Sequence, residues 1–210
     1  MLKLVISVAW LCMQVTFSAL MRLRVVAVFT CLFAAPVYAA GPSGGVVSAG
    51  SATITQSAAQ TTIKQTSDKA VVNWSNFSIG SGSTVRFVQP SASSIALNRV
   101  SGAQASVIQG ALQANGQVWV LNPNGVLIAP GGQVATGSFL ATTRSLTDQQ
   151  FMAGQYAFTD GGVAGASVVN QGSIIVAEGG YAVLAGEAVR NEGYIEANLG
   201  QVVLGGAKAF

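Results

Sequence analysis

Two segments near the end of the chain repeat with a fixed spacing. Residues 170–176, Asn-Gln-Gly-Ser-Ile-Ile-Val, are followed 21 residues later by residues 191–197, Asn-Glu-Gly-Tyr-Ile-Glu-Ala. A second glycine and a short apolar run follow each copy, and a related unit lies upstream at 110–120. A period near twenty residues is typical of solenoids, in which one repeat cannot bury its apolar face alone. The sequence therefore predicts a stack of similar layers.

Each repeat holds two or three short apolar runs, bounded by Gly, Asn-Gly or Gly-Gly. Such runs are typical of short strands, and they lie at 53–55, 62–64, 84–88, 117–121 and 201–204. A coil of a parallel β-helix has this organisation, with alternate side chains pointing into a narrow interior. We therefore predict an all-β fold, a parallel β-helix. Val, Ile, Leu and Ala should fill the interior, and Gly and Asn should occupy corners where the backbone takes positive φ.

Two regions lack the repeat. Residues 40–69 are rich in Gly, Ser, Thr and Gln, and we expect them to form an N-terminal cap over an otherwise exposed pairing edge. Residues 141–167 include Phe151, Tyr156 and Phe158, and are predicted to leave the helix as an excursion. Its aromatic side chains should fold back onto an outer face.

The N-terminal residues 1–39 are typical of a secretory signal peptide. Residues 21–24 form a short stretch with two arginines, residues 25–35 are apolar or small, and the small-residue pattern at 37–39 precedes Ala40. The apolar run is too short to span a bilayer as a mature helix. A start at Met21 would give a leader of ordinary length, and an extended leader from Met1 is the alternative. Residues 40–210 would then form the β-helix domain.

Removal of this leader would change the charge of the chain. Lys3, Arg22 and Arg24 would be lost from ten basic residues, leaving seven against seven acidic ones. A neutral domain has no electrostatic basis for binding nucleic acid. Cys12 and Cys31 would also be lost, which excludes a disulfide scaffold and a thiolate metal site in the mature chain.

The residues that support catalysis are sparse. The chain has no histidine, and its acidic residues are scattered, mostly beside turn-forming residues. Glu192 and Glu196 could pair as in glycosidases, but their surroundings favour solvated turns. The glycine-rich stretches lack a following Gly-Lys-Ser/Thr for phosphate binding. We therefore predict no enzymatic activity, no cofactor, no metal and no small-molecule substrate. A polysaccharide-processing β-helix enzyme or a carbohydrate-binding surface protein is the alternative.

One motif stands out, Asn122-Pro123-Asn124-Gly125, between two apolar runs. Proline fixes φ at the second position of a turn, Asn122 can cap the turn, and Asn-Gly readily adopts left-handed conformations. The motif is either a tight corner between buried strands or a displayed recognition turn. The residues alone leave both interpretations open.

The order of several further motifs resembles the secretion domain of filamentous-haemagglutinin-type exoproteins, which are exported by two-partner secretion. The matching segments are Trp-Ser-Asn-Phe-Ser-Ile-Gly at 74–80, 85–92, 96–100, 108–116, 122–125, Phe151, 170–172 and 191–193. The similarity covers essentially all of residues 41–206. The second family motif, Asn-Pro-Asn-Leu, is missing, and Asn-Phe-Ser-Ile occupies its neighbourhood at 76–79. This chain is therefore closer to the adhesin and haem-carrier-binding members that also lack it.

The resemblance implies a right-handed parallel β-helix with a cap and a small extra-helical β-sheet. It also implies recognition in the periplasm by the POTRA domains of a dedicated outer-membrane β-barrel transporter, followed by export to the cell surface or the medium. Asn122, Pro123, Asn124 and Gly125 match the family's Asn-Pro-Asn-Gly motif and would be the recognised residues. Asn98 and Arg99 would be secondary recognition residues or structural ones. Host-cell or carbohydrate surfaces are the expected adhesion targets.

The last residues, 201–210, show no polar cap over the final coil. Members of the resembling family usually continue for many more coils. We therefore expect the β-helix to continue beyond Phe210, unless the gene is truncated or another chain covers this edge.

Overall fold

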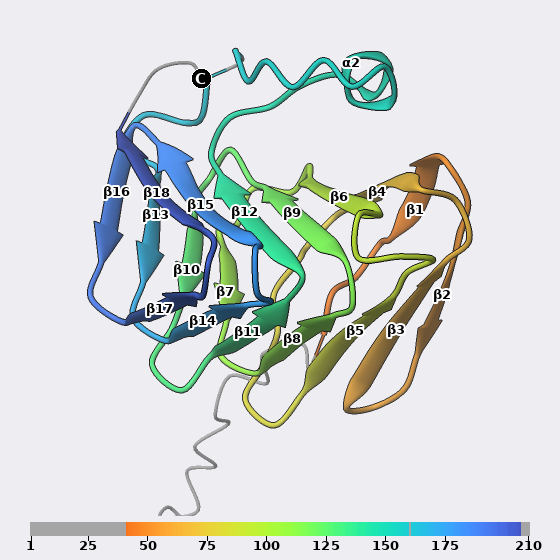
Figure 1. The fold of residues 1–210 in the computed structure, drawn as a ribbon, viewed down its shortest axis with the longest axis horizontal. Coiled ribbons are helices and arrows are strands. Elements are labelled where there is room, and N and C mark those ends of the chain that lie inside the picture. Colours follow the sequence, from red (N-terminus) through yellow and green to blue (C-terminus); the bar gives the residue numbers. More distant parts are fainter. Residues whose placement is uncertain (1–40, 160, 207–210) are drawn as a thin grey trace, which may run out of the picture. The chain divides into compact units, whose positions relative to one another are not determined.

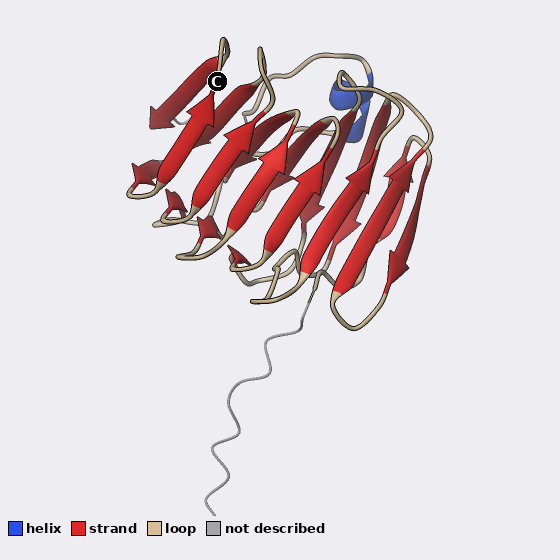
Figure 2. Cartoon of the chain, turned by 60° about the horizontal axis from the view of Figure 1, so that its bottom comes forward, coloured by secondary structure: helices blue, strands red, loops and turns tan. Residues whose placement is uncertain are grey.

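A computed structural model describes residues 41–159 and 161–206, which form a β-solenoid of three sheets (Figures 1 and 2). The expected signal peptide, with its two alternative starts, lies outside these residues. No helix within the described ranges is both long enough and apolar enough to span a membrane.

The three sheets run along the solenoid. Sheet I contains, in spatial order, β1 (Val46–Ala49), β4 (Lys69–Trp74), β6 (Ile95–Val100), β9 (Gln117–Leu121), β12 (Ser138–Thr142), β15 (Tyr181–Gly186) and β18 (Gln201–Gly206). Sheet II contains β17 (Tyr194–Ala197), β14 (Ser173–Val176), β11 (Gln133–Thr136), β8 (Ala111–Ala114), β5 (Thr84–Val88), β3 (Gln60–Gln65) and β2 (Ala52–Gln56). Sheet III contains β16 (Ala188–Asn191), β13 (Ser167–Asn170), β10 (Val126–Ile128) and β7 (Ser106–Ile108).

The 21-residue repeat is one coil of the solenoid. Asn170 pairs with Asn191 in sheet III, and Ile174 pairs with Ile195 in sheet II. Both strand pairs are parallel, as are the later pairs of sheet I. The predicted parallel β-helix is therefore confirmed, with each residue stacked on its counterpart one repeat later.

The interior is filled as the alternation of strand side chains requires. In β6, Ala96 and Val100 point into the main core, whereas Ile95 and Leu97 belong to a second cluster on the outer face. Inward positions are mostly Val, Ile, Leu and Ala, as predicted, with a few aromatic residues such as Phe87. Burial of each large side chain contributes at most about 1.5–3 kcal/mol.

Positive φ, the predicted reason for glycines at corners, holds at turns such as Gly131. The glycines of the repeat are required for a different reason. None of Gly132, Gly172 and Gly193 has a positive φ, and neither does Asn170. The three glycines line the corner between sheets III and II, where an added Cβ would overlap with a carbonyl oxygen of the preceding coil. At Gly172, for example, that oxygen belongs to Gly132. These positions exclude a side chain because neighbouring coils approach closely there.

The N-terminal edge is covered by two antiparallel strands. β1 pairs with β4 and β2 pairs with β3, whereas β3 pairs in parallel with β5. The range 40–69 assigned to the cap from sequence thus includes β3, which already belongs to the first coil. The antiparallel strands occupy the edge on which a further parallel strand could otherwise add.

The excursion leaves the solenoid after β12 and returns at β13. Leu140 and Val183 are register partners 43 residues apart, whereas Trp119 and Leu140 are partners 21 residues apart. The excursion contains the short helix α2 (Asp148–Met152). The resemblance implies a small extra-helical β-sheet without a position in the chain; the named strands of the described residues all belong to the three solenoid sheets.

A local signal explains the helix. Thr147 accepts a hydrogen bond from the backbone of Gln150, and the Gln150 side chain accepts one from the backbone of Thr147. This capping box satisfies two backbone donors at the helix start. Beyond it, Phe151 and Phe158 are buried against the outer face of sheet I. The predicted return of the excursion's aromatic residues onto an outer face is confirmed.

Candidate functional site

The motif at 122–125 forms the corner between β9 and β10. The Gly125 amide donates to the Asn122 carbonyl at 3.0 Å, closing the turn, and the Asn124 amide donates to Asn122 Oδ1 at 2.9 Å. Gly125 has a φ of 114°. A proline-containing turn capped by its first asparagine was predicted from the sequence, and the structure confirms it.

The Asn122 side chain is fully buried and ties the turn to the preceding coil. Its Nδ2 donates to the Gln104 carbonyl at 3.0 Å and to Ser106 Oγ at 2.9 Å. Nearby, Asn124 Nδ2 donates to the Gly102 carbonyl at 2.7 Å. Both asparagine side chains therefore satisfy backbone groups of the loop before β7 that have no partner within a strand.

The same corner is held from the following coil. The Asn122 amide donates to the Thr142 carbonyl at 3.0 Å, and the Val163 amide donates to the Pro123 carbonyl at 2.8 Å. Pro123 and Asn124 are half-buried, and Asn122 and Gly125 are buried. A partner can reach the Asn122 side chain only when these coils are not assembled.

Asn98 and Arg99, the other predicted pair, point to opposite faces of β6. Asn98 is fully buried and accepts a hydrogen bond from the Trp74 indole at 3.0 Å. Its Nδ2 donates to the Trp119 carbonyl at 3.2 Å. Asn98 thus satisfies polar groups within the core, where an unpaired group is expensive to bury.

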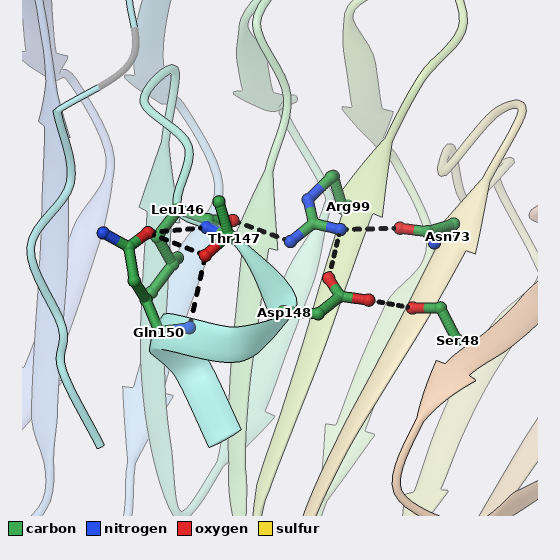
Figure 3. A network of polar contacts seen from close by, with 7 residues as sticks. All are labelled: Ser48, Asn73, Arg99, Leu146, Thr147, Asp148 and Gln150. Atoms are coloured by element: carbon green, nitrogen blue, oxygen red, sulfur yellow. Dashed lines mark hydrogen bonds and ion pairs between the residues drawn. The ribbon is translucent and has the colours of Figure 1, made fainter. Parts of the chain in front are cut away.

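Arg99 lies on the outer face, where it holds the excursion (Figure 3). Its guanidinium donates to Asp148 Oδ1 at 2.6 Å, to the Leu146 carbonyl at 2.7 Å and to Asn73 Oδ1 at 3.0 Å. Arg99 is the register partner of Leu121, which directly precedes the turn. The structure therefore places Arg99 beside the start of the motif, but directs its side chain to α2.

Two groups around the excursion have altered pKa values. Partial burial raises the pKa of Asp148, but hydrogen bonds from Ser48 and Arg99 and the Arg99 charge outweigh it, so the pKa is lowered. Asp148 therefore stabilises the fold above its unfolded pKa, and this contribution is lost as the pH falls through the lowered folded value. Burial raises the pKa of Tyr181 to about 12. Its hydroxyl stays protonated near neutral pH and donates to Gln117 Oε1 at 2.6 Å.

The two carboxylates considered for glycosidase chemistry are bound to different neighbours. Glu192 accepts from the Gln171 side chain at 2.8 Å and lies 3.6 Å from Arg190. Glu196 accepts from Tyr194 and Asn198 at 2.8 Å and 2.7 Å. The described residues contain no cluster of three or more His, Cys, Asp or Glu that could hold a metal ion.

A small cavity of about 200 Å³ lies beside the turn. Its wall includes Asn76, Ile79 and Gln104, the residue whose carbonyl accepts from Asn122. Asn76 Oδ1 is buried and makes no hydrogen bond among the described residues. The wall carries no charged side chain, and so gives no basis for assigning an ionic ligand.

Comparison with known families identifies the chain. The TPS secretion domain model matches residues 39–210. The chain belongs to this family of two-partner-secretion domains. The resemblance seen in the ordered sequence motifs is thereby confirmed. The domain is the secretion module of an exported exoprotein, which passes through the periplasm to the cell surface or the medium.

Similar proteins agree with this assignment. A heme/hemopexin-binding protein of Haemophilus influenzae is 37% identical over 180 residues, covering 80% of this chain and 19% of that protein. A second heme/hemopexin-binding protein from Haemophilus influenzae is 47% identical over 98 residues, covering 47% of this chain and 11% of that protein. The HMW1 secretion domain, also from Haemophilus influenzae, has a crystal structure that matches with a TM-score of 0.75 and 33% identity. This match covers 80% of the present chain and 45% of that one. The chain thus spans about a fifth of the length of the first relative.

Proposed function

We propose that residues 122–125 are recognised while the chain is unfolded in the periplasm, by the POTRA domains of a dedicated outer-membrane transporter. The observation that supports this order is the burial of Asn122, whose side chain and amide are fully engaged within the folded corner. An unfolded chain presents the same four residues free of these contacts. Recognition followed by folding uses one motif twice, first as a signal and then as a corner.

The proposed role is non-catalytic and needs no cofactor. After export, each coil offers a strand edge in each sheet on which the next coil adds. The antiparallel cap, β1 and β2, leaves only one direction for this growth because it occupies the opposite edge. Folding from the cap onward would then proceed without an external energy source.

The adhesive part of the function belongs to the whole exoprotein. Each relative named as a heme/hemopexin-binding protein is at least about five times as long as the region that matches this chain. We propose that binding to a haem carrier, a host-cell surface or a carbohydrate is performed by regions of such an exoprotein outside this secretion domain.

Substitution in the motif separates its two roles. Asn122→Ala should abolish export through the transporter, because it removes a residue of the signal as well as four hydrogen bonds of the corner. Ser106→Ala is the matched control, since it removes one acceptor of the same asparagine but leaves the motif intact. Each is expected to reduce the free energy of unfolding, by about 1–3 kcal/mol.

Export is measured as protease-accessible protein at the surface and in the medium, and stability is measured by urea denaturation. We expect Ser106→Ala to be exported and Asn122→Ala to remain in the periplasm. Asn198→Ala, at an exposed turn, should behave as the unaltered chain in export. If export fell in proportion to stability in every variant, the motif would be a structural corner with no signal function.

A further inference from the structure

Residues 146–158 form a strap across the outer face of sheet I. The strap begins at Leu146, includes α2 and ends at Phe158, and all of it lies within the described residues. Figure 1 shows α2 beside β1 and β4, the strands at the N-terminal end of sheet I. These strands are far in sequence from β12, after which the excursion begins. Its contacts fall into a polar set and an apolar set.

The polar contacts join the strap to the cap and the first coils. Asp148 accepts from Ser48 of β1 at 2.7 Å and from Arg99 of β6 at 2.6 Å (Figure 3). Lys69 of β4 donates to the carbonyls of Phe151 and Met152, both at 3.2 Å. The sequence separations are 100 residues for the Ser48 contact and 82 for the first Lys69 contact. These two contacts tie the cap and the first coil directly to the excursion.

The apolar contacts surround the outward ring of Trp119 on β9. The ring centroids of Phe151, Tyr156 and Phe158 lie 5.6, 4.8 and 5.8 Å from that of Trp119. Lys69 Nζ lies 5.2 Å from the centre of the Tyr156 ring, a cation–π distance. Beneath the strap, the outward side chains of Val71, Leu97 and Leu140 complete this second core.

A solenoid coil normally contacts only its neighbours, so its stability spreads through nearest-neighbour terms. The strap departs from that rule because it contacts β1, β4, β6 and β9 at once. The helix it carries has five residues, too short to persist in water without tertiary contacts. The strap is therefore either docked and ordered or detached and unfolded.

We propose that residues 146–158 are a closing strap that locks the cap and the first coils into one cooperative unit, with Arg99 as the positioning residue that holds it shut. Arg99 is suited to this role because one guanidinium binds α2 through Asp148, the strap's first residue through its carbonyl, and β4 through Asn73. Docking of the strap onto the folded domain does not require the transporter. Its consequence for export rests on the proposed function: the strap follows β1 to β12 in the chain, so these strands emerge with their outer apolar face uncovered.

Hydrogen exchange in the full chain tests the strap directly. With Arg99→Ala, the amides of Phe151, Ala153 and Gln155, bonded within the strap, should exchange at least about tenfold faster, because hydrogen bonds to a charged group are lost. Amides of β11 and β14 in sheet II should keep their rates. Arg86→Ala, at an exposed outward position of sheet II, is the matched control and should change neither set.

A second measurement covers the case in which Arg99→Ala is too unstable to assay. Asp148→Asn removes the charge from the same ion pair while conserving the shape of the side chain, and should accelerate strap exchange in the same direction. Arg99→Lys should restore only part of the protection, because one ammonium cannot reproduce the forked geometry. Strap exchange that is unchanged in both Arg99→Ala and Asp148→Asn would overturn the proposal. So would acceleration that is equal in the strap and in sheet II, because the strap would then have no separate closing step.

Discussion

Replacement of Gly132 by alanine is expected to remove most of the stability of the domain. The new Cβ would overlap with the carbonyl oxygen of Ile108 and lie 3.0 Å from that of Ala129. The Ile108 oxygen is a backbone atom of the preceding coil, whereas that of Ala129 belongs to the same turn as Gly132. Relief would therefore require the two coils to separate and the parallel pairing around the corner to weaken. We expect a loss of more than about 4 kcal/mol in the free energy of unfolding, which is at the extreme for single substitutions.

The neighbouring glycine provides the matched control. Gly131 has a φ of 83°, but nothing lies within 4 Å of its added Cβ. Gly131→Ala should therefore cost about 1–2 kcal/mol from backbone strain alone. Urea denaturation followed by far-ultraviolet circular dichroism measures both variants. Equal losses for the two would contradict this account, because the close approach of coils at Gly132 would then add no cost beyond that of an ordinary strained turn.

Replacement of Trp119 by alanine is expected to have the second largest effect. The ring is 4% exposed and packs against three aromatic side chains of the strap, so its removal should cost about 3–5 kcal/mol. Its indole also donates to the Tyr181 hydroxyl at 2.8 Å. Trp119→Phe keeps an aromatic ring but loses this hydrogen bond, which should cost about 1 kcal/mol. The smaller ring also makes fewer contacts, and this should add a further cost.

The readout for these two variants is the urea midpoint together with exchange of the strap amides. Trp119→Ala should lower the midpoint and accelerate exchange at Phe151, whereas Trp119→Phe should retain most of the protection. A cost below about 1 kcal/mol for Trp119→Ala would contradict the description of the strap and the outer face as a second core.

The solenoid could be predicted from the sequence because its information is local and periodic. Asn170 and Asn191 occupy equivalent positions, and in the structure Asn170 Nδ2 donates to Asn191 Oδ1 at 2.8 Å. Alternation along each strand then decides which side chains enter the core. The reason for the glycines of the repeat could not be predicted, because the distance between coils at a corner depends on how all the coils stack.

The strap is the part of the fold that the sequence predicts least completely. Its departure from the repeat and its aromatic return were predictable from Phe151 and Phe158. The capping box at Thr147 and Gln150 is a helix signal readable in the sequence, but no helix was predicted there. The partners Ser48, Lys69 and Arg99 are 47–100 residues away along the chain from the groups they bind. No periodicity links them to the strap, so only the folded arrangement identifies them.

The turn at 122–125 was predicted in conformation but not in environment. Proline and Asn-Gly chemistry is local, whereas the burial of Asn122 depends on Gln104 and Ser106, which lie just before and at the start of β7 in the preceding coil. Asn98 likewise gave no sequence signal of its hydrogen bond with Trp74. An asparagine is rarely buried in a core without a specific partner, and this partner lies 24 residues earlier in the chain.

Export of the full chain from a Gram-negative host, with and without a two-partner outer-membrane transporter, is the most direct measurement of the function proposed for this domain. We expect folded, protease-resistant domain at the cell surface or in the medium only when the transporter is present, and periplasmic, protease-sensitive chain when it is absent. Equal amounts of exported, folded protein in the two cases would contradict transporter-dependent secretion.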